Sequence, residues 1–353
     1  MVAAVMDPLS KYSRRKYGSH LDLAELPWFE VENGRLILAD RSLGPIADVH
    51  SHLALTYMRR RSVDLLAEHE DAELYLPVAH ALDLEVYANK NFTEPELDAL
   101  SRDLALKAVT KDGMRRTHTV PNLERHMRET GVTTSVLLPI EFPFLSWNAE
   151  TWLEATRGRD GFCNLGSVHP FGRAVRERLE RQKAAGIRGI KLHPAVQMFP
   201  PDHPRAMEIY RACADLDLPV LWHCGPVDIE TRIGRWCTQL KHYWRAVAEH
   251  PDTRFVLGHS GALQFDMGLE LAQRYRNVWL EISSQGIGNV RRLVLEAPED
   301  RVMFGSDWPF YHQSMPLAKL LIATDDRPGM RPAILWENAA ALFGLDAARS
   351  SRS

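Results

Sequence analysis

The chain has 353 residues, of which 45% are hydrophobic and 25% are charged, a composition typical of a soluble globular protein with a sizeable core. Its formal net charge of −3 gives no sign of the strongly basic face that nucleic-acid-binding proteins present. No run of about 18 apolar residues occurs, so the sequence predicts no membrane span.

The cysteines and the N-terminus indicate the cellular compartment. Cys163, Cys213, Cys224 and Cys237 are scattered without a C-x-x-C pair, which favours reduced thiols over a disulfide framework. The segment Ser13-Arg14-Arg15 loosely resembles a twin-arginine signal, but the residues after it are too polar for an apolar signal segment. We therefore expect a cytoplasmic protein.

Three regions are expected along the chain: an N-terminal extension over 1–45, a main domain over 46–345 and a C-terminal tail over 346–353. Within the extension, Trp28-Phe29 is followed by Asn33-Gly34 and an apolar run. This pattern predicts a small hairpin or a cap on the main domain.

The main domain alternates short apolar runs with longer helical patterns, which predicts parallel βαβ units. Eight such units are what a closed (β/α)₈ barrel requires, with a doubly wound open sheet as the alternative. The expected helices include Arg173–Ala185, Pro204–Leu216, Trp236–His250 and Ala262–Tyr275. The expected strands are Ile46–Val49, Thr133–Leu138, Phe162–Val168, Gly189–Leu192, Pro219–Trp222, Arg254–Leu257, Val278–Ile282 and Val302–Phe304.

Residues 53–120 form a long stretch between the first two expected strands, and we interpret them as an insertion. The insertion is expected to be mostly helical, with helices at Ser62–Leu76 and Glu94–Ala108. Loops that follow barrel strands lie on the active face, so the insertion is predicted to cap or line the substrate pocket.

Two histidines, His50 and His52, end the first expected strand at positions i and i+2. Side chains alternate along a strand, so both imidazoles point to the same side, which in a barrel is the interior mouth. Two imidazoles placed in this way can bind one divalent cation. The motif by itself is short and common by chance.

Further polar residues end the fifth, sixth and eighth strands: His223, His259 and Asp307. Each of them alone has an ordinary alternative, because a buried histidine can be a hydrogen-bonded core residue and a strand-end aspartate often caps a helix. Together with the two histidines of the first strand they place five imidazole or carboxylate groups on one face. Such a set suits zinc or another divalent transition metal.

The order of these residues resembles that of the amidohydrolase superfamily. The flanking segments Asp48–His52, Gly189–Pro194 and Phe304–Pro309 are similar to its amidohydrolase-related branch, which contains the aminocarboxymuconate-semialdehyde decarboxylase group. The resemblance covers roughly residues 45–345.

Roles for the five residues follow from the resemblance. It implies that His50, His52 and His223 are metal ligands, and that Asp307 is a ligand or near-ligand and the proton shuttle. It implies that His259 is a base or polarising group outside the ligand set.

Lys191 and His193 share a face of the fourth expected strand, and their roles stay open. In binuclear members of the superfamily a lysine of this strand is carboxylated and bridges two metals. Lys191 could do this, pair with a buried carboxylate or contact substrate, and His193 could contact substrate or simply end its strand. A single metal is common in this branch, so we expect one zinc, or one manganese, and a second metal only if Lys191 is carboxylated.

Four residues are weaker candidates for substrate binding. His169 and Trp308, which end the third and eighth strands, could line the pocket, although core packing is the commoner role of tryptophan. Tyr57 and Arg59 closely follow the first strand. An arginine there could clamp a substrate carboxylate through two hydrogen bonds, or form part of a solvated basic turn.

The favoured function is a metal-dependent hydrolase acting on an amide, lactone or ester carbonyl of a small molecule. A bound metal lowers the pKa of water from about 15.7 to about 7, Asp307 would take the proton and His259 would stabilise the oxyanion. The alternative is a non-oxidative decarboxylase of an aromatic or unsaturated carboxylic acid. A barrel that binds a ligand without turnover is the third hypothesis. A homodimer is expected from the resemblance alone.

Overall fold

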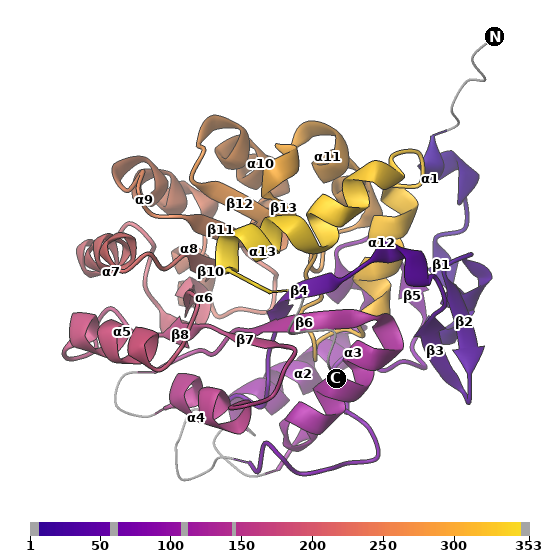
Figure 1. Ribbon diagram of the computed structural model, residues 1–353, viewed down its shortest axis with the longest axis horizontal. Helices are drawn as coiled ribbons and strands as arrows, with labels where there is room; N and C mark the ends of the chain where they lie inside the picture. The colour runs from indigo at the N-terminus through magenta and orange to yellow at the C-terminus, as the bar shows by residue number, and fades with distance from the viewer. Residues whose placement is uncertain (1–6, 57–62, 107–111, 143–145, 347–353) are drawn as a thin grey trace.

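The structure is a computed structural model that describes residues 7–56, 63–106, 112–142 and 146–346. Its centre is a set of parallel strands with helices around them (Figure 1). In chain order the strands are β4 (Ile46–Ser51), β6 (Val132–Leu137), β7 (Phe162–Asn164), β8 (Gly166–Ser167), β9 (Ile190–Leu192), β10 (Val220–His223), β11 (Phe255–Gly258), β12 (Val278–Glu281) and β13 (Val302–Met303).

These strands form two parallel sheets, in the orders β4-β6-β7 and β8-β9-β10-β11-β12-β13. At one junction only Leu165 separates β7 from β8, and its N–H donates to the carbonyl of Leu137 at 3.0 Å. At the other, Val49 N–H donates to the Phe304 carbonyl at 2.9 Å and Asp307 N–H donates to the His50 carbonyl at 2.8 Å. The ring is thereby closed, and the predicted (β/α)₈ barrel is confirmed over the open-sheet alternative.

Helices cover the outside of the barrel. The larger ones are α3 (Val120–Thr130), α4 (Asn148–Ala155), α5 (Val175–Ala184), α7 (Pro204–Asp215), α9 (Tyr243–Glu249), α10 (Phe265–Arg274), α11 (Ile287–Glu296) and α12 (Ser314–Ala323). The final helix, α13 (Asn338–Phe343), crosses one end of the barrel in Figure 1. There Leu342 and Phe343 pack with interior side chains such as Val49 and Val256, so this end is closed by apolar contacts.

The single helix expected at Trp236–His250 is wrong. The chain instead forms α8 (Arg232–Cys237), a short 3₁₀ turn and α9. Tertiary hydrogen bonds replace helical ones at the break, because the Thr238 carbonyl accepts from Gly225 N–H at 3.2 Å and Leu240 N–H donates to the Gln264 side chain at 2.8 Å.

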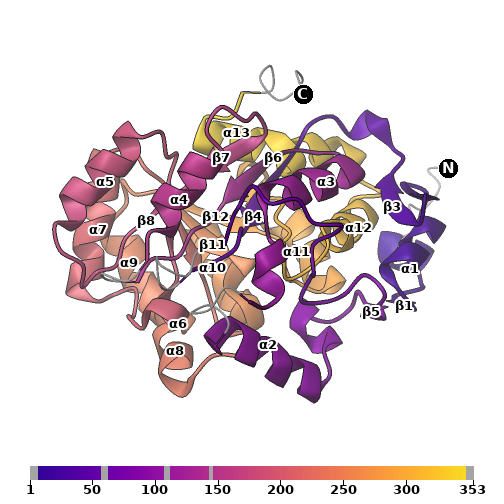
Figure 2. The same cartoon turned by 90° about the horizontal axis from the view of Figure 1, so that it is seen from below.

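The insertion after β4 contains one long helix, α2 (Glu94–Leu106), which confirms the expected helix up to its described end. The helix expected at Ser62–Leu76 is wrong over its described part, which is irregular. The backbone of this segment bonds to the loop after β13 instead of forming helical bonds. The N–H groups of Tyr75 and Leu76 donate to the carbonyls of Pro309 and Phe310 at 3.1 and 3.0 Å. In Figure 2, α2 lies along the lower side of the molecule together with α8 and α6 (Pro194–Gln197).

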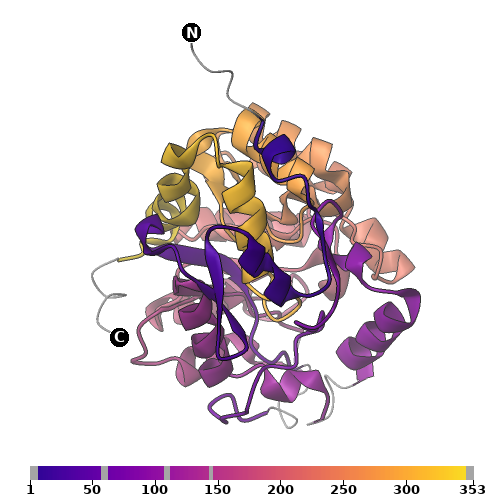
Figure 3. The ribbon, with the colours of Figure 1, turned by 90° about the vertical axis from the view of Figure 1, so that its right-hand side faces the viewer.

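The N-terminal extension forms the small hairpin that was one of its two expected structures (Figure 3). Its strands are β2 (Phe29–Glu32) and β3 (Arg35–Leu38), which pair in antiparallel fashion. The turn residues Asn33 and Gly34 have φ angles of 51° and 77°, as a two-residue turn with two positive φ angles requires. Nearer the N-terminus, β1 (Lys16–Tyr17) pairs with β5 (Leu82–Asp83) of the insertion, so extension and insertion are joined.

All four cysteines are buried and free, which confirms the expectation of thiols without disulfides. Among the described residues, no helix combines the length and the apolar character needed to cross a bilayer.

Candidate metal centre and active site

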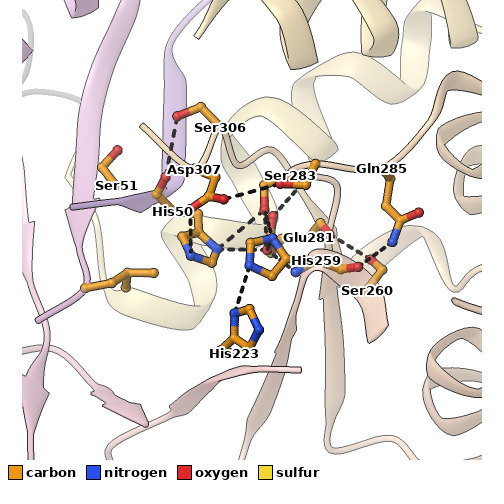
Figure 4. Close-up of polar contacts among 12 residues, drawn as sticks. His50, Ser51, His223, His259, Ser260, Glu281, Ser283, Gln285, Ser306 and Asp307 are labelled. Atoms are coloured by element: carbon orange, nitrogen blue, oxygen red, sulfur yellow. Dashed lines mark hydrogen bonds and ion pairs between the residues drawn. The ribbon is translucent and has the colours of Figure 1, made fainter. Parts of the chain in front are cut away.

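The carboxyl ends of β4, β10 and β11 and the segment after β13 bring the predicted site residues together (Figure 4). The rings of His50 and His259 stack with centroids 4.6 Å apart, and those of His193 and His223 stack at 4.0 Å. Asp307 Oδ1 lies 3.6 Å from Nε2 of both His50 and His52. Parallel strands therefore deliver these groups to one end of the barrel, opposite α13.

The protonation of His50 and His52 follows from their hydrogen bonds. His52 Nδ1 lies 2.8 Å from the Leu138 carbonyl, which can only accept, so Nδ1 carries the proton. His50 Nδ1 lies 2.9 Å from Glu281 Oε1. In both rings Nε2 is left with its lone pair facing Asp307, which is the tautomer that binds a metal.

Glu281 organises the centre of the site, and the sequence analysis missed it. Besides His50, its carboxylate accepts from the backbone N–H groups of His259 and Ser283 and from Ser283 Oγ–H at 2.8 Å. Burial raises the pKa of Glu281 to about 7, while these donors favour its charged form. Gly305 permits this packing, since a Cβ there would lie 2.4 Å from Glu281 Oε2.

His259 and His223 form a proton-ordered chain that begins at Glu281. Ser283 Oγ gives its hydrogen to Glu281, so it accepts from His259 Nδ1 at 2.7 Å. His259 Nε2 is then an acceptor, and His223 Nδ1 donates to it at 3.2 Å. His223 Nε2 is left buried without a hydrogen-bond partner. The Nε2 lone pair of His223 is thereby available to a metal, whereas the Nε2 lone pair of His259 already accepts a hydrogen bond from His223.

Asp307 is held in an unusual conformation, with φ of 66° in the left-handed region. Its N–H donates to the His50 carbonyl and its Oδ2 accepts from Ser284 Oγ at 3.3 Å. Burial, reinforced by the nearby negative charge of Glu281, raises the pKa of Asp307 well above its usual value. A carboxyl group whose pKa is raised takes up a proton more readily than an ordinary one, as a proton shuttle requires.

Asp48 fixes the end of β4 to the segment that carries Asp307. Its buried carboxylate accepts from Ser306 N–H at 2.9 Å, Ser306 Oγ at 2.6 Å and Gln313 Nε2 at 2.7 Å. These bonds anchor the two sides of the barrel seam next to the histidines.

Lys191 and His193 also lie at this end of the barrel. Lys191 is fully buried, its Nζ has no hydrogen-bond partner, and burial lowers its pKa to about 7. His193 caps α6, where its Nδ1 accepts from Val196 N–H at 3.3 Å. This bond is the one expected of a strand-end histidine, and a role in substrate binding stays a prediction.

The four weaker candidates for substrate binding differ in where the structure places them. Both ring nitrogens of His169 are used locally, toward the Gln197 carbonyl at 2.9 Å and Phe171 N–H at 3.2 Å. Trp308 is fully buried, so the structure places it in the core. Tyr57 and Arg59 lie outside the described residues.

A cavity beside His52 contains residues of the insertion that the sequence analysis did not single out. Its walls include Tyr75, Arg115, His118 and Phe310. Arg115 is buried and donates to the Leu55 carbonyl and Thr56 Oγ1, both at 3.1 Å. The insertion thus supplies part of the wall of this cavity, and its role over the substrate pocket stays a prediction.

The donor set fits a divalent metal. His50, His52 and His223 each offer a buried Nε2 lone pair, and Asp307 offers a carboxylate oxygen between two of them. Three imidazoles and one carboxylate match the preferences of zinc and related ions. By distance alone, the three groups within 4.8 Å of one another are His50, His259 and Asp307. The ligand role of His223 and the non-ligand role of His259 stay predictions, and the proton order favours them.

A second group of the same kind lies elsewhere among the described residues: His126, Glu129 and His312. Here the indole N–H of Trp308 donates to His126 Nδ1 at 2.9 Å, which forces the proton onto Nε2. His126 Nε2 then donates to Asp71 at 2.8 Å, and Arg35 binds Glu129 and Asp71 at 2.6 and 3.0 Å. This group is a hydrogen-bonded ion network, with no nitrogen of His126 open to a metal.

A family model described as amidohydrolase matches residues 47–345. This chain belongs to the amidohydrolase superfamily. It lies in the amidohydrolase-related branch, as its strand-end motifs indicated, and it is an enzyme of that superfamily by descent. No curated protein matches this chain in sequence.

Solved structures with the same fold include several enzymes. The 5-carboxyvanillate decarboxylase of Novosphingobium aromaticivorans, solved with manganese and a nitrobenzoic acid, is 16% identical with a TM-score of 0.58, over 89% of this chain and 100% of that one. A probable 2-pyrone-4,6-dicarboxylic acid hydrolase of Acinetobacter baumannii is 16% identical with a TM-score of 0.54, over 85% and 99%. The 2,6-dihydroxybenzoate decarboxylase of Rhizobium is 19% identical with a TM-score of 0.54, over 86% and 99%. At these identities the likeness concerns the fold.

Proposed function

We propose that this amidohydrolase-superfamily member is a metal-dependent hydrolase of a small carbonyl compound, such as a lactone, ester or amide. The observation that carries the proposal is the position of Asp307, whose Oδ1 lies 3.6 Å from the open Nε2 atoms of His50 and His52. A base at this position can deprotonate the water that attacks the substrate.

His50, His52, His223 and Asp307 would hold one metal, zinc or manganese. When bound, such an ion polarises a substrate carbonyl and makes water more acidic. Asp307 would receive the proton of the attacking water and return it to the leaving group, for which its raised pKa suits it. Glu281 and His259 would keep the imidazoles in the metal-binding tautomer. The free buried thiols support a cytoplasmic location.

A second metal depends on Lys191. Carboxylation needs a neutral amine, and the lowered pKa of Lys191 supplies a neutral fraction at physiological pH. The buried Nζ without a partner is compatible with that modification, which stays a prediction.

Decarboxylation of an aromatic carboxylic acid is the second candidate. It is favoured by the cavity beside His52, where Tyr75, His118 and Phe310 offer aromatic walls and Arg115 a buried cation. Aromatic rings bind flat substrates by stacking, and arginine binds carboxylates. Two of the solved structures above are decarboxylases of substituted benzoic acids.

The experiment that separates the two candidates offers the zinc- and manganese-loaded enzyme three compounds: 2-pyrone-4,6-dicarboxylate, 5-carboxyvanillate and 2,6-dihydroxybenzoate. Proton release and carbon dioxide release are recorded in parallel. The hydrolase proposal predicts proton release from the pyrone without carbon dioxide, and loss of that signal in Asp307→Asn. Carbon dioxide release from either benzoate, with no opening of the pyrone ring, would overturn the hydrolase proposal in favour of the decarboxylase.

A further inference from the structure

The turn that carries His259 has an unusual backbone. Its four residues, 259–262, have φ angles of 56°, 48°, 91° and 49°, all in the region that favours glycine, although only Gly261 is a glycine. Such a conformation is unfavourable for the other three residues and persists only where the surrounding structure holds it. The groups that hold this turn therefore set the position of His259.

The side chain of Gln285, in the loop after β12, binds both ends of this turn (Figure 4). Its Nε2 donates to the carbonyl oxygens of His259 and Ala262 at 2.6 and 3.0 Å. Its Oε1 accepts from Asn289 Nδ2 at 2.8 Å, so both the nitrogen and the oxygen of the amide have partners. Gln285 is buried and held in one orientation, so its amide braces the turn.

Lys319 supports the same residue from α12. Its side chain is fully buried, and Nζ donates to the backbone carbonyl of Gln285 at 2.8 Å. Burial lowers the pKa of Lys319 to about 7. A buried amine is unfavourable unless it is hydrogen-bonded, and this bond ties the loop after β12 to the helix behind it.

The position of His259 matters to the predicted metal ligand His223. His223 Nδ1 donates to His259 Nε2 at 3.2 Å, which leaves His223 Nε2 with its lone pair. The N–H of His259 is bonded as well, to Glu281 Oε1. A shift of the turn would move His259 away from His223 and release the proton that this bond keeps on Nδ1.

We propose that Gln285 is a positioning residue that fixes the proton of His223 through the turn at His259. Its amide holds the unfavourable backbone of residues 259–262, and Lys319 holds the backbone of Gln285. A role of this kind requires no contact with the substrate or the metal ion. The inference rests on the proposed metal-dependent function, in which His223 is a ligand.

The test uses full-length protein with nitrogen-15 in its histidines, first without metal and then loaded with cobalt(II). The nitrogen chemical shifts report which ring atom carries the proton, and the rate of cobalt loss to excess EDTA reports how firmly the ion is held. Gln285→Met removes the amide and keeps a side chain of similar length. Lys319→Met removes the supporting amine. The matched control is Gln182→Met, a buried glutamine of α5 whose Nε2 donates to the Ser167 carbonyl at 3.1 Å.

In wild type we expect both His223 and His259 to carry the proton on Nδ1. In Gln285→Met their nitrogen shifts should move toward those of a mixture of the two tautomers. Cobalt should be lost about tenfold faster, since partners behind a metal ligand typically change metal affinity by 10–100-fold. Lys319→Met should move the same signals to a smaller extent, and Gln182→Met should match wild type in both measurements.

Unchanged nitrogen shifts of His223 and His259 in Gln285→Met would overturn the inference. If Gln285→Met does not fold, unchanged shifts in Lys319→Met would overturn it. Wild-type protein that binds no cobalt would instead contradict the proposed function, while the nitrogen shifts of the metal-free protein still decide the inference.

Discussion

In the part of the chain that the structure describes, two buried groups each bring ligand atoms of two histidines and a carboxylate within 4.8 Å of one another, and they differ in where their protons lie. At the barrel mouth, His50 donates its Nδ1 proton to Glu281 and leaves Nε2 open. At His126, the Trp308 indole occupies Nδ1 and Asp71 occupies Nε2. Residue type and proximity are therefore insufficient to identify a metal site. The direction of each hydrogen bond decides whether a histidine nitrogen keeps a lone pair for a metal.

The largest expected effect is on turnover. Asp307→Asn removes the proton acceptor, and we expect the rate with whichever of the three test compounds is turned over to fall by about 10²–10⁴-fold. Asp71→Asn changes the carboxylate that binds His126 of the second group, and it should leave the rate within about twofold, measured in the same assay. Equal losses in both variants would contradict the distinction between the groups.

Glu281→Gln tests the support of His50. The amide brings hydrogens where Glu281 now accepts them, so the tautomer of His50 is no longer fixed. We expect zinc affinity, measured by competition with a chromophoric chelator, to fall by about 10–100-fold. Glu129→Gln serves as the control and should leave zinc affinity unchanged.

How far the sequence predicts this site depends on how local each signal is. The strands end visibly at His50, His223 and Asp307, because apolar runs stop at single polar residues. Glu281 follows the apolar run 278–280 in the same way, and this pattern could have identified it as a site residue from the sequence. Its role depends on bonds to His50 on β4 and to His259 just after β11, which no local pattern contains.

The same distinction between local and tertiary signals explains which parts of the fold were predicted correctly and which were not. The hairpin is encoded by Asn33-Gly34, a local turn signal. The helix expected at Ser62–Leu76 fails because Tyr75 and Leu76 bind carbonyl groups of the loop after β13, more than two hundred residues away. The segment 84–88 likewise gains its position through tertiary contacts, since Ala88 N–H donates to the Ser284 carbonyl and Ile287 N–H donates to the Leu84 carbonyl.

A smaller effect is expected in the second group. Trp308→Phe removes the donor to His126 and should lower the free energy of unfolding by about 1–3 kcal/mol, because a buried acceptor loses its partner. Urea denaturation measures this, with Trp152→Phe as a control for lost side-chain volume at a similarly buried site. Metal content should not change, and a gain of metal at the freed His126 would break the comparison.

The smallest effect concerns pH. Burial lowers the pKa of His20, whose ring lies 5.9 Å from that of His312, to about 3. The unfolded chain, with a histidine pKa of about 6.5, binds this proton more readily. His20 therefore contributes to acid sensitivity: stability is complete above about pH 6.5 and declines as the pH falls toward 3. Urea denaturation between pH 7 and pH 5 should show a shallower decline in His20→Gln, and an identical decline would contradict the assignment.

The central claim is tested most directly by metal analysis with plasma mass spectrometry. Wild-type protein purified without chelators is compared with His50→Ala/His52→Ala and with His126→Ala/His312→Ala. The account predicts about one zinc or manganese per chain in wild type, its loss in the first double variant and its retention in the second. Retention of metal by His50→Ala/His52→Ala, or its loss from His126→Ala/His312→Ala alone, would contradict it.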